Sequence, residues 1–150
     1  MVKGKLTIVP MRTGDIPAVL ELEAGTLSAW SREHLEDELQ QPAGFQFVVR
    51  NKAAAKILAV LCGRIMADEA EILKLSVAQE ARRKGLGYKL LDFVLDYCRA
   101  KGVKNCFLEL RTSNTAAANL YEKRGFMRVG SRRAYYDEPV EDAVLMQLAL

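Results

Sequence analysis

The short motif R-R-K-G-L-G at residues 82–87 contains three basic residues and two glycines. The motif separates an apolar segment that is typical of a strand from an amphipathic segment that is typical of a helix. The first turn of a helix presents unpaired N–H groups and the positive end of the helix dipole, so it attracts anions. Glycines let the backbone approach phosphate oxygens, and the basic side chains add charge-assisted donors. The motif therefore predicts a phosphate-type site, with an ordinary helix start bearing surface arginines as the alternative.

Several other kinds of site are disfavoured by the same sequence. Leu90 stands where the third glycine of the dinucleotide fingerprint G-x-G-x-x-G belongs, and no Walker A sequence G-K-[ST] follows. His34 is the single histidine, which excludes a multi-histidine metal centre. A Ser-His-Asp hydrolase would need His34 and a G-x-S-x-G elbow, which the chain lacks. We therefore expect no metal, and chemistry that runs on carboxylates, tyrosines, hydroxyls, lysines or backbone groups.

Together with other segments, the glycine motif resembles the GCN5-related N-acetyltransferase (GNAT) superfamily. In that superfamily a strand, the pattern [QR]-x-x-G-x-[GA] and a helix bind the pyrophosphate of acetyl-coenzyme A (acetyl-CoA). The chain's C-terminal part and its Trp-Ser pair resemble one branch, the ribosomal-protein-alanine N-acetyltransferases of RimI type. Besides residues 82–87, the resemblance is carried by L-E-L-R-T-S-N at 108–114, Ala117, L-Y-E at 120–122, Gly125-Phe126, R-R-A-Y-Y at 132–136, E-D-A at 141–143, Met146 and Trp30-Ser31.

The resemblance implies an acetyl-CoA-dependent N-acetyltransferase. Members of the branch modify the N-terminal alanine of a small-subunit ribosomal protein, so the expected partner is a basic protein or peptide N-terminus. We expect a cytoplasmic location and no membrane partner. We also expect no direct nucleic-acid partner, because no aromatic residues are interleaved with the basic cluster. The alternatives are a GNAT enzyme acting on a small amine or a lysine, and a module that only holds coenzyme A or RNA.

Acetyl transfer from a thioester to an amine requires one group that accepts a proton and one that donates a proton. An α-amine has a pKa near 8 and a lysine amine one near 10.4, so a weak base serves an N-terminus more easily. The resemblance places the catalytic glutamate at Glu109, which strand alternation puts on the same side as Phe107 and Arg111. A solvated Glu109 paired with Arg111 is the alternative. The resemblance places the proton donor at Tyr121, whose alternative is a core aromatic beside Leu120.

The remaining expected site residues follow from the resemblance and from local patterns. Backbone groups of the strand at residues 75–77 are expected to pair with the amides of the pantetheine chain. Asn114 has two expected roles, as a helix N-cap and as a hydrogen-bonding partner along the cofactor. Trp30 and Tyr135 are candidate acceptor contacts, with packing under a loop as the alternative. The expected cofactor-binding residues are Leu75, Ser76, Val77, Arg82, Arg83, Lys84, Gly85, Leu86, Gly87, Tyr88 and Asn114.

Hydrophobic periodicity predicts the elements that position these residues. The expected order is β-α-α-β-β-β-α-β-α-β-β, with strands at 6–9, 45–50, 57–66, 70–77, 106–110, 126–129 and 144–150. Helices are expected at 13–27, from Ser31 to before Pro42, at 86–101 and at 114–124. The strand-helix-strand crossover over 70–110 requires parallel pairing. We therefore predict an α/β fold with a central twisted mixed sheet and helices on both faces.

Length and composition limit the number of domains and the kinds of segment that the chain can contain. The chain has 150 residues, of which 50% are apolar and 27% charged, and we expect one domain over 1–150. The longest apolar run, residues 57–62, is too short to span a membrane, and the apolar run at 6–9 is too short for a signal-peptide core. Cys62, Cys98 and Cys106 are scattered, which favours a reducing compartment over a disulfide framework.

Charge is distributed unevenly along the chain. The net charge is +3, but residues 13–41 hold seven acidic residues and one basic residue, Arg32. The rest of the chain is correspondingly basic. One acidic and one basic region would suit a cationic partner on one side and an anionic ligand on the other, whereas two solvated surfaces are the plainer interpretation.

Overall fold

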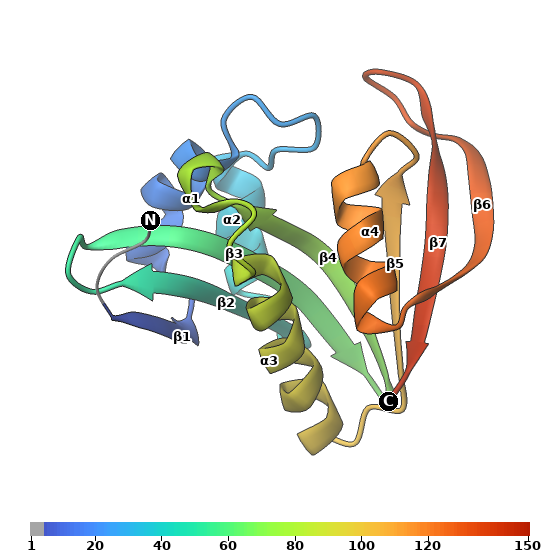
Figure 1. Ribbon diagram of the computed structural model, residues 1–150, viewed down its shortest axis with the longest axis horizontal. Coiled ribbons are helices and arrows are strands. Elements are labelled where there is room, and N and C mark those ends of the chain that lie inside the picture. Colours follow the sequence, from blue (N-terminus) through green and yellow to red (C-terminus); the bar gives the residue numbers. More distant parts are fainter. Residues whose placement is uncertain (1–4) are drawn as a thin grey trace.

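The computed structural model describes residues 5–150 and contains one seven-stranded sheet (Figure 1). The strands lie in the order β1-β2-β3-β4-β5-β7-β6, and only the β4–β5 pair is parallel among these neighbours. The strands are β1 (Leu6–Pro10), β2 (Gly44–Asn51), β3 (Lys56–Met66), β4 (Glu69–Val77), β5 (Asn105–Arg111), β6 (Met127–Tyr136) and β7 (Glu141–Ala149). The helices are α1 (Ile16–Glu23), α2 (Arg32–Leu39), α3 (Leu86–Ala100) and α4 (Thr115–Arg124), with 3-10 turns at Thr13–Asp15 and Gln79–Ala81.

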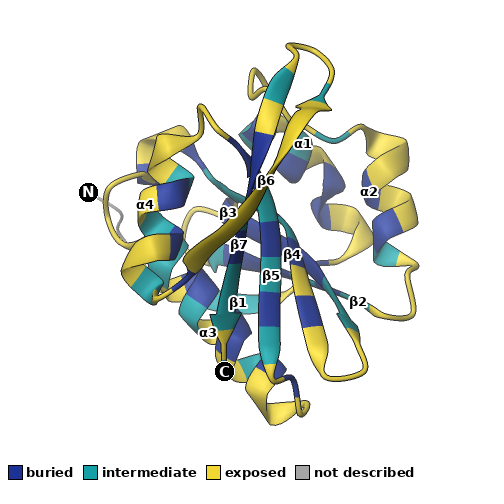
Figure 2. Ribbon diagram, turned by 90° about the vertical axis from the view of Figure 1, so that its right-hand side faces the viewer, coloured by how far each residue is buried: buried dark blue, intermediate teal, exposed yellow. Residues whose placement is uncertain are grey.

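The predicted element order and mixed sheet are confirmed, but several boundaries differ, most of all in α1 and in the β6–β7 hairpin. Helix α1 ends at Glu23 rather than at residue 27, because Ala24 leaves the helical conformation with ψ 128°. The β6–β7 hairpin is longer than expected, since β6 continues to Tyr136 and β7 begins at Glu141. Strand β6 is exposed along nearly its whole length (Figure 2). It therefore has no alternation of buried and exposed residues that would indicate how far the strand continues beyond residue 129.

Helices cover both faces of the sheet, α3 and α4 on one and α1 and α2 on the other (Figure 2). Strand β3 shows the division, because Leu61 packs into the cluster with α3 while Val60 and Cys62 pack into the cluster with α1. Helix α3 packs its apolar face on the sheet, and Leu90 and Val94 on this face are fully buried. We call the two sides the α3 face and the α1 face. No helix within residues 5–150 is long and apolar enough to cross a membrane.

Strands β4 and β5 pair along only part of their length. The parallel ladder joins Glu69–Ile72 to Asn105–Leu108 and extends no further. Opposite β3 the register shifts at this point, since Gly63 pairs with Ile72 and Cys62 pairs with Lys74, which leaves Leu73 as an extra residue. A bulge of this kind bends its strand. Beyond it β4 and β5 diverge, and their separated ends border the cleft described below (Figure 1).

The three cysteines are free and lie in the apolar interior. Burial raises the thiol pKa of Cys62 and of Cys106 to about 12, and that of Cys98 to about 11. A thiol with so high a pKa is protonated at neutral pH and is a poor nucleophile. These residues therefore act as small apolar core side chains.

Candidate active site

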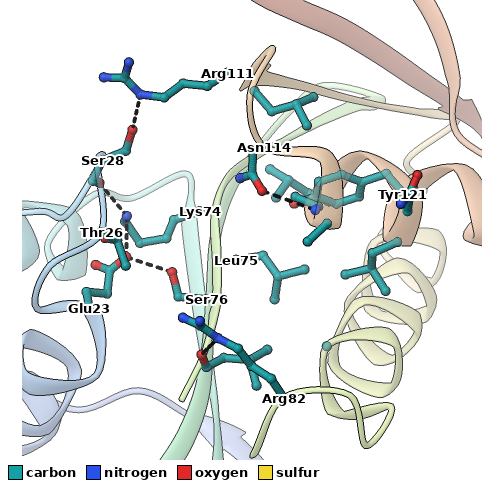
Figure 3. Close-up of a pocket in the computed structure, with 18 of the residues that line it drawn as sticks. Glu23, Thr26, Ser28, Lys74, Leu75, Ser76, Arg82, Arg111, Asn114 and Tyr121 are labelled. Atoms are coloured by element: carbon teal, nitrogen blue, oxygen red, sulfur yellow. Dashed lines mark hydrogen bonds and ion pairs between the residues drawn. The ribbon is translucent and has the colours of Figure 1, made fainter. Parts of the chain in front are cut away.

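A cleft of about 1040 Å³ lies where β4 and β5 diverge (Figure 3). Its walls come from the end of α1, the α1–α2 loop (24–31), β4, the glycine loop (82–87), α3, β5 and α4. The structure brings together thirteen of the expected site residues in this lining: Trp30, Leu75, Ser76, Val77, Arg82, Arg83, Gly85, Leu86, Gly87, Tyr88, Glu109, Asn114 and Tyr121. Lys84 and Tyr135 are not among the residues that line the cleft.

The glycine loop leads directly into α3. Gly85 adopts the left-handed conformation with φ +79°, which costs an L-residue energy but not glycine. The first intrahelical bond runs from the N–H of Lys89 to the carbonyl of Gly85 (3.0 Å), so the N–H groups at 86–88 precede the helical ladder. Ser31 and Asn114 cap α2 and α4 with their side-chain oxygens, whereas no side chain in the described chain caps α3. The start of α3 thus retains the donors that an anion requires.

The side chains around the glycine loop differ in where they point. Arg82 Nε donates to the carbonyl of Val77 (3.1 Å), which fixes the corner between β4 and the loop. Arg82 and Arg83 line the cleft, whereas the Lys84 ammonium donates to the carbonyl of Glu80 (3.1 Å). At Gly87 a Cβ atom would lie 3.3 Å from both Leu120 Cδ2 and Val77 Cγ2. A larger residue there would push on two side chains of the cleft wall.

The bulge in β4 shifts the alternation of its side chains by one residue, so that Ile72 and Leu75, three residues apart, both pack on the α3 face. Leu75 packs with the α3-face cluster, while Lys74 and Ser76 point to the α1 face and contact Glu23 (Figure 3). Residues 73–77 have no ladder partner on the β5 side within the described chain. Main-chain groups at such an open strand edge can pair with an extended ligand.

Tyr121 enters the cleft from α4 on the α3 face (Figure 3). The residue is buried, and its ring meets that of Phe126 edge-on with centroids 5.4 Å apart. Burial raises the pKa of the phenol well above its ordinary value of about 10. The hydroxyl is therefore protonated over the whole physiological pH range. The sequence offered a proton-donor role and a core aromatic as alternatives. The structure shows the packing, and it also places Tyr121 in the cleft lining, where the donor role stays a prediction.

Glu109 lies on the α1 face of β5, since its neighbours Leu108 and Leu110 belong to the α3-face core. The alternative pairing with Arg111 is wrong: Glu109 Oε1 instead lies 3.4 Å from Arg132 Nε of β6. The carboxylate side chain is 22% exposed and its arginine partner 58% exposed, so the pair is open to solvent. Tyr135 hydrogen-bonds to Glu109, and this bond raises the pKa of the tyrosine. Tyr135 thus contacts the expected proton acceptor although it is not part of the lining.

A buried ion pair on the α1 face was not predicted. Lys74 Nζ lies 2.6 Å from Glu23 Oε2, and Ser76 Oγ donates to the same oxygen at 2.8 Å. The lysine also donates to the carbonyl of Ser28 (2.9 Å) and lies 4.7 Å from the ring centre of Trp30, which stacks on exposed His34. A lysine inside an apolar strand was the available signal, but nothing in the sequence indicated a partner 51 residues away.

The acidic segment at 13–41 is less acidic in the folded protein than its sequence suggests. Asp15 pairs with Arg50 (2.9 Å), Glu38 pairs with Arg64 (2.8 Å), and Glu23 pairs with Lys74. The hydrogen bond to Glu38 also raises the pKa of Arg64. Three of the seven acidic side chains are therefore paired with cations of the sheet. This surface is less acidic than the sequence alone indicates.

The fold is that of known N-acetyltransferases. The crystal structure of the ribosomal-protein-S18-alanine N-acetyltransferase from Escherichia coli superposes with a TM-score of 0.87 at 32% identity, covering 97% of this chain and 94% of that one. The structure of Ard1 from Thermoplasma volcanium gives a TM-score of 0.87 at 25% identity, with 97% of each chain covered. The likeness to the E. coli enzyme defines the class of protein as an N-acetyltransferase fold.

Sequence comparisons agree with the structural ones. The model of the acetyltransferase (GNAT) family matches residues 16–126. The N-alpha-acetyltransferase RimI of Mycobacterium tuberculosis is 32% identical over 95% of this chain and 91% of that protein. The chain therefore belongs to the acetyltransferase (GNAT) family, which confirms the predicted fold class and the predicted class of enzyme. Enzymes of this family use acetyl-CoA as acetyl donor.

Proposed function

We propose that this protein transfers the acetyl group of acetyl-CoA to the N-terminal α-amine of alanine in ribosomal protein bS18. The observation that carries the proposal is one cleft, lined by the open edge of β4, the uncapped start of α3, Glu109 and Tyr121. The [ribosomal protein bS18]-alanine N-acetyltransferase of E. coli is 32% identical over 96% of this chain and 97% of that protein. An enzyme that acts on a ribosomal protein is expected to work in the cytoplasm.

The chain offers suitable partners to each part of the donor. The N–H groups at 86–88, with Arg82 and Arg83, can hold the diphosphate of coenzyme A. Main-chain groups at residues 75–77 can pair with the amides of the pantetheine chain, and a free N–H on this edge can polarise the thioester carbonyl. Asn114 is already used as an N-cap, since its Oδ1 accepts from the N–H of Ala117 (3.2 Å). Its amide nitrogen remains the group that can reach a ligand.

Glu109 and Tyr121 divide the proton transfers between the two faces of the sheet. Glu109, on the α1 face, accepts the proton of the attacking amine. Tyr121, on the α3 face, donates a proton to the departing sulfur. In water a phenol is about 1.5 pKa units less acidic than a thiol, so this transfer is uphill there. Burial raises the pKa of the phenol, so Tyr121 keeps its proton until the thiolate departs. The same apolar surroundings would disfavour a free thiolate and so make it a stronger proton acceptor.

The proposed base favours an N-terminal acceptor over a lysine. At pH 7 roughly a tenth of free α-amines are neutral, whereas fewer than about one lysine amine in a thousand is. Glu109 is partly exposed and paired with Arg132, and a carboxylate is in general a modest base. A modest base serves the α-amine well and the lysine poorly.

A peptide assay tests the proposed function. The protein is incubated with acetyl-CoA and a basic peptide that begins with the alanine end of bS18, and the products are sequenced by tandem mass spectrometry. We expect one acetyl group on the α-amine. A matched peptide with a blocked N-terminus and free lysines is the control and should remain unmodified. Acetylation of the lysines alone, or only of small amines, would contradict the proposed acceptor while leaving the family assignment intact.

A further inference from the structure

Arg111, the last residue of β5, contacts two segments that are far apart in the sequence, and Figure 3 shows the first of these contacts, with Ser28. Its Nε donates to Ser28 Oγ in the α1–α2 loop (3.1 Å), and its Nη1 donates to the carbonyl of Pro139 in the β6–β7 turn (2.9 Å). The side chain is only 9% exposed. One guanidinium therefore links the two loops that flank this end of the cleft.

Further contacts fix the orientation of the guanidinium. Nη1 also donates to Glu141 Oε1 (3.2 Å), Nη2 lies 3.5 Å from the carbonyl of Glu138, and the group stacks 4.5 Å from the ring centre of Tyr136. The other oxygen of Glu141 accepts from the N–H of Ser113. A lysine carries its charge on a single ammonium group. It cannot reproduce the planar guanidinium, whose N–H donors point in several fixed directions. The contacts thus depend on arginine specifically.

The two loops have little else to hold them in place. Residues 24–29 of the α1–α2 loop and all four residues of the β6–β7 turn (137–140) are exposed. Segments with few buried apolar contacts open at low free-energy cost unless polar contacts hold them. Within the described chain, Ser28 is held at its carbonyl by Lys74 and at its hydroxyl by Arg111. These two cations anchor the loop to the sheet.

We propose that Arg111 is a positioning residue that sets the width of the acceptor entrance. It ties the α1–α2 loop to the β6–β7 turn, and so fixes the opening on the α1 face, where Glu109 lies. The inference rests on the proposed function in one respect, namely that the acceptor amine approaches from the α1 face. The guanidinium makes its hydrogen bonds to Ser28 and to residues 138–141, and none of these belongs to the proposed donor-binding groups at 75–77 and 82–88.

Steady-state kinetics separate this role from general stabilisation. In Arg111→Lys we expect the KM for the acceptor peptide to rise about tenfold, while the KM for acetyl-CoA changes less than about twofold. Ser28→Ala, which removes one contact only, should raise the acceptor KM about threefold. The control is Arg50→Lys, since Arg50 pairs with Asp15 outside the cleft; it should lower the melting temperature without changing either KM. Equal increases of both KM values in Arg111→Lys would overturn the proposal.

Hydrogen exchange of the free protein tests the tie without any acceptor, so its outcome is independent of whether the substrate is correctly named. We expect faster exchange in both 24–31 and 137–140 for Arg111→Lys, and in 24–31 alone for Ser28→Ala. Should Arg111→Lys fail to fold, the Ser28→Ala exchange and kinetics decide. Unchanged exchange in the loop of Ser28→Ala, together with an unchanged acceptor KM, would contradict the positioning role.

Discussion

The two sides of the cleft are built in different ways. On the α3 face the groups suited to a donor are mostly main-chain N–H and C=O groups within one stretch, residues 75–88. On the α1 face the walls are held by side chains from distant segments, since Ser28 and Arg111 are 83 residues apart and Glu23 and Lys74 are 51 apart. A local main-chain site tolerates changes of side chain, whereas a site assembled from remote side chains changes with each of them. The first suits an invariant cofactor, and the second suits an acceptor that differs between relatives.

The largest effect on catalysis is expected at Glu109, the proposed proton acceptor on the α1 face. Glu109→Gln keeps the shape of the side chain and removes the proton acceptor, so kcat should fall about 10²- to 10⁴-fold. The dissociation constant of acetyl-CoA, measured by calorimetry, should remain unchanged. Glu69→Gln, an exposed residue at the start of β4, is the matched control and should keep full activity. An unchanged kcat in Glu109→Gln would remove the proposed base.

The next largest effect is one of stability and tests the buried pair on the α1 face. Lys74→Met leaves the Glu23 carboxylate buried without its cation, and should lower the free energy of unfolding by about 3–5 kcal/mol. Adding Glu23→Gln should recover part of that loss, because the uncompensated charge is then removed. Lys56→Met, which breaks an exposed pair with Glu80, should change the free energy of unfolding far less, because water already solvates both charges. Urea titrations would measure all three, and equal losses for the two lysines would contradict the account.

On the α3 face, Tyr121→Phe should lower kcat about 10²-fold and leave acetyl-CoA affinity unchanged, because the ring still packs on Phe126. The pH profile adds a second readout. Since burial raises the pKa of this phenol, the protonated form persists above pH 10. Wild-type activity should therefore rise through about pH 8 as the acceptor amine loses its proton, without a decline up to about pH 10. A wild-type decline between pH 8 and 9.5 would argue against Tyr121 as donor. Tyr97→Phe, in the core beside Phe45, is the control.

A smaller effect is expected in the glycine loop. Gly87→Val places methyl groups against Leu120 and Val77, which narrows the donor side of the cleft, so the dissociation constant of acetyl-CoA should rise about tenfold. The acceptor KM should not follow, because the α1 face is untouched. Gly14→Val, where a Cβ meets nothing within 4 Å, should leave affinity unchanged. Wild-type affinity in Gly87→Val would show that the loop does not border the donor.

The sequence predicts the α3 face far better than the α1 face, because the α3-face groups come from one stretch of chain and the α1-face groups come from distant segments. The amphipathic pattern of α3 and the glycine motif are local, so the helix, its start and the adjoining strand follow from adjacent residues. The partner of Glu109 could not be found in this way, because β6 lacks the alternation that would place Arg132 beside it. Likewise the bulge at Leu73, which orients Lys74 and Ser76 toward α1, arises from pairing with β3. Tertiary pairing therefore decided what local patterns left open.

The most direct test of the proposed division between a donor side and an acceptor side is a crystal structure with a bisubstrate compound. In this compound an acetyl group links the sulfur of coenzyme A to the N-terminal amine of the bS18 peptide. The account predicts the diphosphate against the N–H groups at 86–88 and the pantetheine along residues 75–77. It places the peptide on the α1 face, between Ser28 and the β6–β7 turn, with the joined nitrogen near Glu109. A conjugate whose diphosphate lies away from α3, or whose peptide leaves on the α3 face, would contradict it.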